Sequence, residues 1–158
     1  MFVPPRRASI DAWYAWLGVA AVSVAAFGTV AALPSEAPPA AAPVADAVDR
    51  VAASPYEAQT TVPIEATEYK LTPGQIGLRN DGGRSRATFA YGPIAPAIDG
   101  SLRVVLEGRP PASQFASPAA FERAIQRAHQ ESTGWRPAPD AIRVRRVSWE
   151  GVDATLVG

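Results

Sequence analysis

A run of 22 consecutive residues without a charged side chain, residues 12–33, constrains this chain more than any other feature of its sequence. As a helix the run would be about 33 Å long at roughly 1.5 Å per residue, enough to cross a hydrocarbon layer of about 30 Å. Asp11 stands directly before the run, and Pro34 directly follows it. We therefore expect residues 12–33 to form a transmembrane helix surrounded by membrane lipid.

The distribution of basic residues predicts the direction of this helix. Arg6 and Arg7 precede the run, whereas the first basic residue after it is Arg50. Cytoplasmic segments next to membrane spans carry the excess of Lys and Arg. We therefore expect a single-pass protein of the cell membrane, with residues 1–11 as a cytoplasmic stub and the C-terminal part outside the cytoplasm.

Two other interpretations of the same run stay open. A secretory signal would use residues 17–33 as its apolar region and the small residues 30–32 as a cleavage site. A prepilin-type leader would be cut after Ala8, and the apolar helix would then pack inside a filament. In all three interpretations the body of the protein is exported.

Small residues recur along the run at spacings of three and four, so they would line one side of a helix. Such a stripe allows two helices to approach closely in lipid. Eight of the 22 residues are alanine, however, and a stripe of this kind also arises by chance. The candidate helix-packing residues are Gly18, Ala21, Ala25, Gly28 and Ala32.

Proline and alanine dominate the segment that follows the run, residues 34–55. This composition predicts a semi-rigid stalk. A short helix over residues 44–53 would place three valines on one side, and this segment belongs either to the stalk or to the domain. The pattern then changes to that of an exported α+β domain, residues 56–158, with mainly antiparallel strands and one helix.

Turn residues separate short alternating segments in this domain. Residues 72–74 (TPG) and 80–83 (NDGG) are strong turn signals. The second turn predicts a β-hairpin between the segments on either side of it. Strands are expected at residues 68–71, 75–79, 86–91, 102–107, 142–149 and 152–157.

One helix is expected in the domain, over residues 118–130. Ser117 is a favoured N-cap residue, and Pro118 fits the first helical position, where no backbone N–H is needed. Apolar residues recur at helical spacing and predict one buried side, made of Phe121, Ala124, Ile125 and Ala128.

The last two predicted strands form a second hairpin. In the first of them the alternation of apolar side chains changes phase between Val144 and Val147. A β-bulge at Arg145 and Arg146 would explain this change, because a bulge inserts one extra residue into a strand.

The chemistry that this chain can offer is narrow. It has no Cys and one His, which excludes disulfides, cysteine-ligated zinc and a thiol nucleophile. Its 15 basic and 15 acidic side chains balance, so the chain lacks the net positive charge that is typical of nucleic-acid-binding proteins. His129 is interpreted as a partly exposed residue near a helix C-terminus, which favours its charged form. We expect no catalytic residue, no metal and no cofactor.

Three arginines and a tryptophan in the penultimate strand are the best candidates for a partner-binding surface: Arg143, Arg145, Arg146 and Trp149. Arginine and tryptophan dominate the binding energy of many interfaces, and arginine suits acidic partners. The alternative is a solvated side of the strand, in which the arginines pair with Glu150 and Asp153.

Five stretches of the chain carry a resemblance to a known protein family: DAWYAWLGVAAVSVAAFG (residues 11–28), VADAVDRVAAS (44–54), GLRNDGG (77–83), ATFAYGP (87–93) and RVRRVSWEGVDATLVG (143–158). The most specific part is RRVSWEGVD. Together they resemble a family of small haloarchaeal membrane proteins that has no assigned activity. The resemblance implies a link to gene clusters of type IV pilus or secretion machinery.

The sequence thus predicts a non-enzymatic, membrane-anchored envelope protein that tethers an interaction domain outside the membrane. It would be an accessory or minor component of a surface pilus or secretion assembly, with lipid and envelope proteins as partners and without nucleic acid. Two alternatives stay open: a pilin-like subunit processed near Ala8, and an exported hydrolase that uses carboxylates alone. The hydrolase requires two acids that converge in a pocket with opposed pKa shifts.

Overall fold

The computed structural model describes residues 36–131 and 134–158. The predicted transmembrane helix and its small-residue stripe lie outside these residues. Within the described ranges, no helix is both long and apolar enough to cross a membrane. Glu36–Gly158 form one compact unit.

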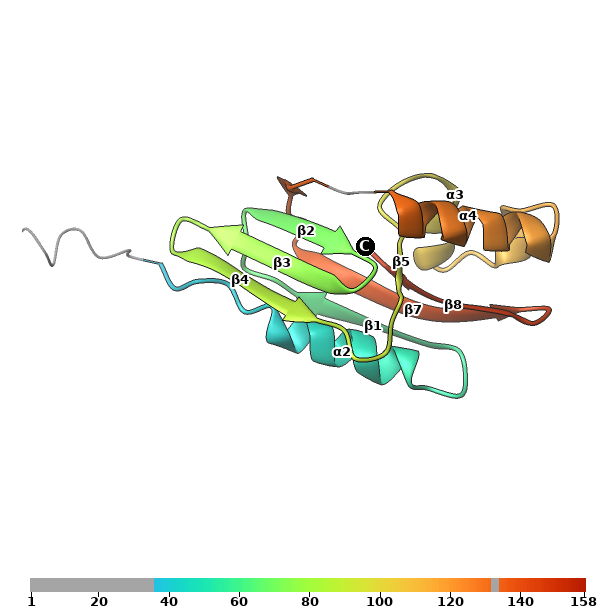
Figure 1. The fold of residues 1–158 in the computed structure, drawn as a ribbon, viewed down its shortest axis with the longest axis horizontal. Coiled ribbons are helices and arrows are strands. Elements are labelled where there is room, and N and C mark those ends of the chain that lie inside the picture. Colours follow the sequence, from blue (N-terminus) through green and yellow to red (C-terminus); the bar gives the residue numbers. More distant parts are fainter. Residues whose placement is uncertain (1–35, 132–133) are drawn as a thin grey trace, which may run out of the picture. The chain divides into compact units, whose positions relative to one another are not determined.

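This unit is an α+β fold, as predicted, and contains two four-stranded sheets (Figure 1). Sheet A has the order β1-β7-β8-β5 and sheet B the order β4-β3-β2-β6. Neighbouring strands are antiparallel except β5, which runs parallel to β8. The strands are β1 (Ala58–Pro63), β2 (Glu68–Thr72), β3 (Gln75–Asn80), β4 (Gly83–Thr88), β5 (Ala95–Pro96), β6 (Arg136–Pro137), β7 (Ala141–Trp149) and β8 (Val152–Val157).

Helices cover both faces of sheet A. These helices are α2 (Ala42–Ala52), α3 (Gly100–Leu106) and α4 (Pro118–Gln130), and the last two are joined through a short 3₁₀ turn, η1 (Pro111–Ser113). Figure 1 shows α2 on one side of this sheet, and α3 and α4 on the other.

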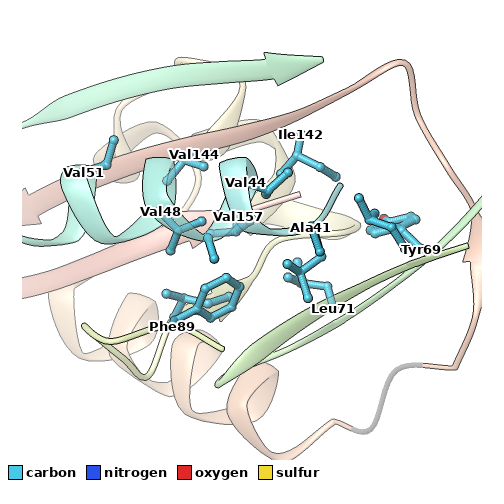
Figure 2. Close-up of a cluster of buried hydrophobic side chains, with 14 residues drawn as sticks. Ala41, Val44, Val48, Val51, Tyr69, Leu71, Phe89, Ile142, Val144 and Val157 are labelled. Atoms are coloured by element: carbon cyan, nitrogen blue, oxygen red, sulfur yellow. The ribbon is translucent and has the colours of Figure 1, made fainter. Parts of the chain in front are cut away.

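Sheet A separates two hydrophobic cores. The first core lies between α2, the inner face of sheet B and one face of sheet A, and Figure 2 shows its side chains. They include Val44, Val48, Val51, Tyr69, Leu71, Ile76, Leu78, Phe89, Ile142, Val144 and Val157. The second core lies under α3 and α4 and includes Leu102, Val105, Phe121, Ile125, Val147 and Leu156.

Strand β7 contributes to both cores, which corrects the predicted β-bulge. Its pairing with β1 and with β8 runs without an inserted residue on either side. Ile142 and Val144 face the first core, and Val147 faces the second. The apolar side chains change phase because the strand changes the face that it buries along its length.

The predicted stalk belongs to the domain from residue 36 onward. The helix predicted at residues 44–53 is α2, and its three valines lie in the first core. Ala41, which precedes α2, is only 1% exposed. The compact unit therefore begins at Glu36 and not at residue 56.

Side chains of the β3–β4 hairpin hold the residues before α2. The Asn80 side-chain amide donates to the Ala37 carbonyl at 2.9 Å. The Ser85 hydroxyl donates to the Pro39 carbonyl at 2.5 Å and accepts from the Ala41 N–H at 3.0 Å. These bonds attach the proline-rich segment to the edge of sheet B.

Strong local signals are confirmed by the structure. The helix predicted at residues 118–130 is α4, and the Ser117 hydroxyl accepts from the Ala120 N–H at 3.3 Å. Both predicted hairpins, β3 with β4 and β7 with β8, are present, and β2 also pairs with β3. However, β4 begins three residues earlier than predicted, because Asn80 pairs with Gly83 across a tight turn.

Several elements differ from the prediction, and the short strands β5 and β6 and the turn η1 are among those that were not predicted. The strand predicted at residues 102–107 is helix α3, whose buried residues Leu102, Val105 and Leu106 follow helical spacing. Strand β1 was not predicted, because its sequence AQTTVP offers few apolar residues and ends in proline.

Candidate functional site

The arginines predicted to bind a partner are placed on two different faces of sheet A. Arg145 Nη1 donates to the Val105 carbonyl at 2.5 Å and to the Arg109 carbonyl at 3.1 Å, beside the C-terminus of α3. Arg146 Nη1 donates to the Ala52 carbonyl at 2.8 Å, at the C-terminus of α2. A cation is favourable at the negative end of a helix dipole. Each guanidinium therefore attaches one helix to the sheet.

The other two members of the predicted set lie apart from each other as well. Arg143 is exposed. Its charge contributes to lowering the pKa of the Glu107 carboxyl, although the larger cause is the hydrogen bond from Arg103 at 2.8 Å. Trp149 is half-buried against the second core, with its ring centroid 6.2 Å from that of Phe121. The four residues therefore do not form one continuous surface.

A cavity of about 290 Å³ lies at the edge of β8, beyond the point where β5 pairs with it. Its lining includes Tyr91, His129, Arg146, Asp153 and Thr155. The His129 Nε2 atom is buried and has no hydrogen-bond partner within the described residues. Burial lowers the pKa of this imidazole, which favours its neutral form.

Two carboxylates of the described residues are paired with arginines. The pKa values of Glu68 and Glu107 are both lowered, each mainly by a hydrogen bond from an arginine. Asp99 and Glu131 share the lining of a second cavity of about 230 Å³. Within the described part of the chain, no three His, Asp or Glu side chains lie close enough to hold a metal ion.

A cluster of cations that the sequence analysis did not single out covers the outer face of sheet B. The strand register places Arg79 opposite Arg84, and places Lys70 and Arg86 on either side of Gly77. In each strand these residues alternate with residues whose side chains point toward the first core, so the cations share the outer face. We call this surface the basic face, defined by Lys70, Arg79, Arg84 and Arg86 together with Glu68 and Trp135.

The tryptophan of the basic face is held over the middle strand. The guanidinium carbon of Arg79 lies 4.6 Å from the centre of the Trp135 ring. A Cβ atom on Gly77 would be 3.2 Å from the ring, so this glycine leaves the space that the indole occupies. Arg79 also forms an ion pair with Glu68.

The signal for the basic face was present in the sequence but was divided among three strands. Segments such as RATF and EYKL alternate polar with apolar residues, which is the normal pattern of a half-buried strand. Only the register of the three strands shows that the cations gather on one surface.

A family model described as a family of unknown function, DUF7283, matches residues 7–147. The matched range includes the apolar run and the domain as far as β7. No curated protein and no solved structure matches the chain.

Proposed function

The chain belongs to DUF7283, a family of unknown function, and from this premise we propose that it is a membrane-anchored envelope protein that acts without catalysis. In this proposal residues 12–33 span the cell membrane and residues 1–11 lie in the cytoplasm. The compact unit Glu36–Gly158 is an interaction domain on the outer side.

One observation carries the proposal: a run of uncharged residues of membrane-spanning length stands two residues before a compact domain. The family model matches the whole run and residues 36–147 of the domain. The basic residues before the run, Arg6 and Arg7, favour a cytoplasmic N-terminus.

The polar groups of the domain support binding more than catalysis. Glu68 and Glu107 are kept ionised by Arg79 and Arg103, which makes neither a good proton donor near neutral pH. The basic face, in contrast, presents charge on an open sheet surface. A charged open surface suits a large partner better than a small substrate.

The resemblance to haloarchaeal proteins linked to pilus or secretion gene clusters supports a more specific proposal. We infer an accessory or minor component of such a surface assembly. Tethering would be its mechanism, because confinement beside the membrane raises the effective concentration of the domain for other envelope proteins.

The intact mass of the protein, isolated from native membranes after a carbonate wash, tests the anchor. A full-length chain in the washed pellet is the expected result, since a spanning helix resists extraction by carbonate. A mature chain that begins near Ser9 would instead indicate a pilin-like subunit. A chain that begins near Leu33 would indicate a released domain, and either result would overturn the proposal.

A further inference from the structure

The basic face carries an excess of positive charge that the domain does not neutralise. Four cations stand on it against one carboxylate, Glu68, which is already paired with Arg79. Lys70, Arg84 and Arg86 form no ion pair within the described residues. The whole chain has equal numbers of acidic and basic side chains, so this excess is local to one surface.

The stability of sheet B does not explain this arrangement. Arg79 and Arg84 occupy directly opposite positions on neighbouring strands. Like charges in opposite positions destabilise an antiparallel pair, whereas a carboxylate at position 84 would stabilise it. The arginine pair therefore lowers the stability of the hairpin while it concentrates positive charge on the surface.

The tryptophan adds an amphipathic ring to the same surface. Trp135 is half-buried between the sheet and solvent, with Arg79 against its ring and Gly77 beneath it. Tryptophan rings favour the headgroup level of membranes, and lysine and arginine favour anionic lipid surfaces. The basic face combines both kinds of residue on one open sheet.

The domain begins only a few residues after the predicted span, at a point beside the β3–β4 turn. Glu36 packs closely against Gly82 in the β3–β4 turn. The contact is so close that a Cβ atom on Gly82 would overlap the Glu36 carbonyl oxygen. Figure 1 shows residues 36–41 beside this turn, and Arg84 follows directly after it. Between Leu33 and Glu36 the extended chain can reach only about 10 Å at roughly 3.5 Å per residue.

We propose that the basic face docks on anionic lipid headgroups of the membrane that holds residues 12–33. The inference rests on the membrane anchor of the proposed function, and it adds an orientation to that anchor. Each unpaired cation near an anionic lipid surface strengthens docking by about five-fold. Because the chain as a whole is neutral, its net charge does not attract it to anionic lipids. The attraction has to come from the cations of the basic face.

The test uses the full-length chain, which has no Cys and therefore accepts a single labelling site. Thr88 is exposed and lies on the outer face of β4 opposite Gln75, so T88C carries a dye on the basic face. The labelled chain is reconstituted in vesicles of phosphatidylcholine, with or without phosphatidylglycerol, that contain a headgroup quencher. We expect stronger quenching in the vesicles with phosphatidylglycerol and loss of this difference at high salt. A dye on E150C, in the β7–β8 turn, is the control that should show no difference.

The variant Arg84→Glu distinguishes a loss of lipid docking from a loss of folding stability. The new carboxylate would lie opposite Arg79, which favours the hairpin, so the unfolding midpoint should rise or stay unchanged. Docking should nevertheless weaken by at least about five-fold. Arg143→Glu, which reverses an exposed arginine of sheet A, should leave the quenching at T88C unchanged.

Equal quenching of T88C in the two kinds of vesicle, with the chain still retained after a carbonate wash, would overturn the inference and leave the anchor intact. The basic face would then be available for an acidic protein partner instead. A chain that carbonate removes from the vesicles would overturn the anchor itself, and lipid docking with it.

Discussion

Arg145 and Arg146 are neighbours in β7, yet their guanidinium groups donate to the carbonyls at the ends of two different helices on opposite faces of sheet A. Arg145 reaches Val105 near the end of α3, and Arg146 reaches Ala52 at the end of α2. Successive side chains of a strand point to opposite faces. One dipeptide therefore links both helical layers to the same strand.

Arg146→Met should destabilise the domain, because the Ala52 carbonyl loses a charged donor at the end of α2. The expected loss is roughly 1.5–3 kcal/mol of unfolding free energy, measured by urea denaturation. Arg143→Met is the matched control on the same strand, and its exposed side chain should change the free energy by less than about 0.5 kcal/mol. Equal effects of the two substitutions would contradict the role assigned to Arg146.

A chain that begins at residue 36 should fold, whereas a chain that begins at residue 56 should not. The shorter chain lacks α2 and the burial of Val44, Val48 and Val51 in the first core. Each buried valine contributes about 1.5–3 kcal/mol, against a typical total stability of about 5–15 kcal/mol. Cooperative thermal unfolding, followed by circular dichroism, distinguishes the two chains. A cooperative transition in the shorter chain would show that α2 is dispensable.

Gly82→Ala should displace residues 36–37 from the β3–β4 turn. A Cβ atom on Gly82 would lie 2.0 Å from the Glu36 carbonyl oxygen. The Ala41 N–H, which donates to Ser85, should then exchange with solvent faster, as hydrogen exchange would show. Gly74→Ala in the β2–β3 turn is the control, since no atom lies within 4 Å of a Cβ there. Unchanged exchange at Ala41 would mean that the contact is not required.

The domain should lose stability as the pH falls below about 6.5 because of His129. Burial lowers the pKa of His129 in the folded chain, so the unfolded chain takes up the proton first. The stabilising contribution is therefore present above the ordinary His pKa and decreases below it. The lowered pKa values of Glu68 and Glu107 act in a separate range, below about 4.5.

Urea midpoints measured between about pH 7 and about pH 5 test this prediction. His129→Gln should flatten the pH dependence in this range without affecting the acid limb. A wild-type midpoint that stays constant down to about pH 5 would contradict it.

Elements set by local residues could be predicted from the sequence. The N-cap at Ser117 and the proline after it define the start of α4, and glycine-containing turns define the hairpins. Helix α3 was missed because Leu102, Val105 and Leu106 satisfy a helical spacing, while Leu102, Val104 and Leu106 satisfy a strand spacing just as well. Seven residues are too few to separate the two periods.

Elements defined by contacts between distant residues could not be predicted in the same way. The composition of residues 34–55 is that of a stalk, but small side chains such as Ala41 and Ala45 also pack closely in a core. The candidate site could not be predicted for the same reason, because contacts between distant residues decide which arginines lie together. Arg145 and Arg146 are adjacent in the sequence but lie on opposite faces of sheet A, whereas strand pairing brings Arg79, Arg84 and Arg86 together.

The attachment of residues 37–41 to the β3–β4 hairpin has a mechanical consequence. Any pull on the domain through its N-terminal end acts first on the hydrogen bonds of Asn80 and Ser85, and then on α2. Because α2 supplies a wall of the first core, a load from this end would open that core before it reached α4 and the second core. The domain therefore has a weak side under tension, and it is the side from which the predicted anchor would pull.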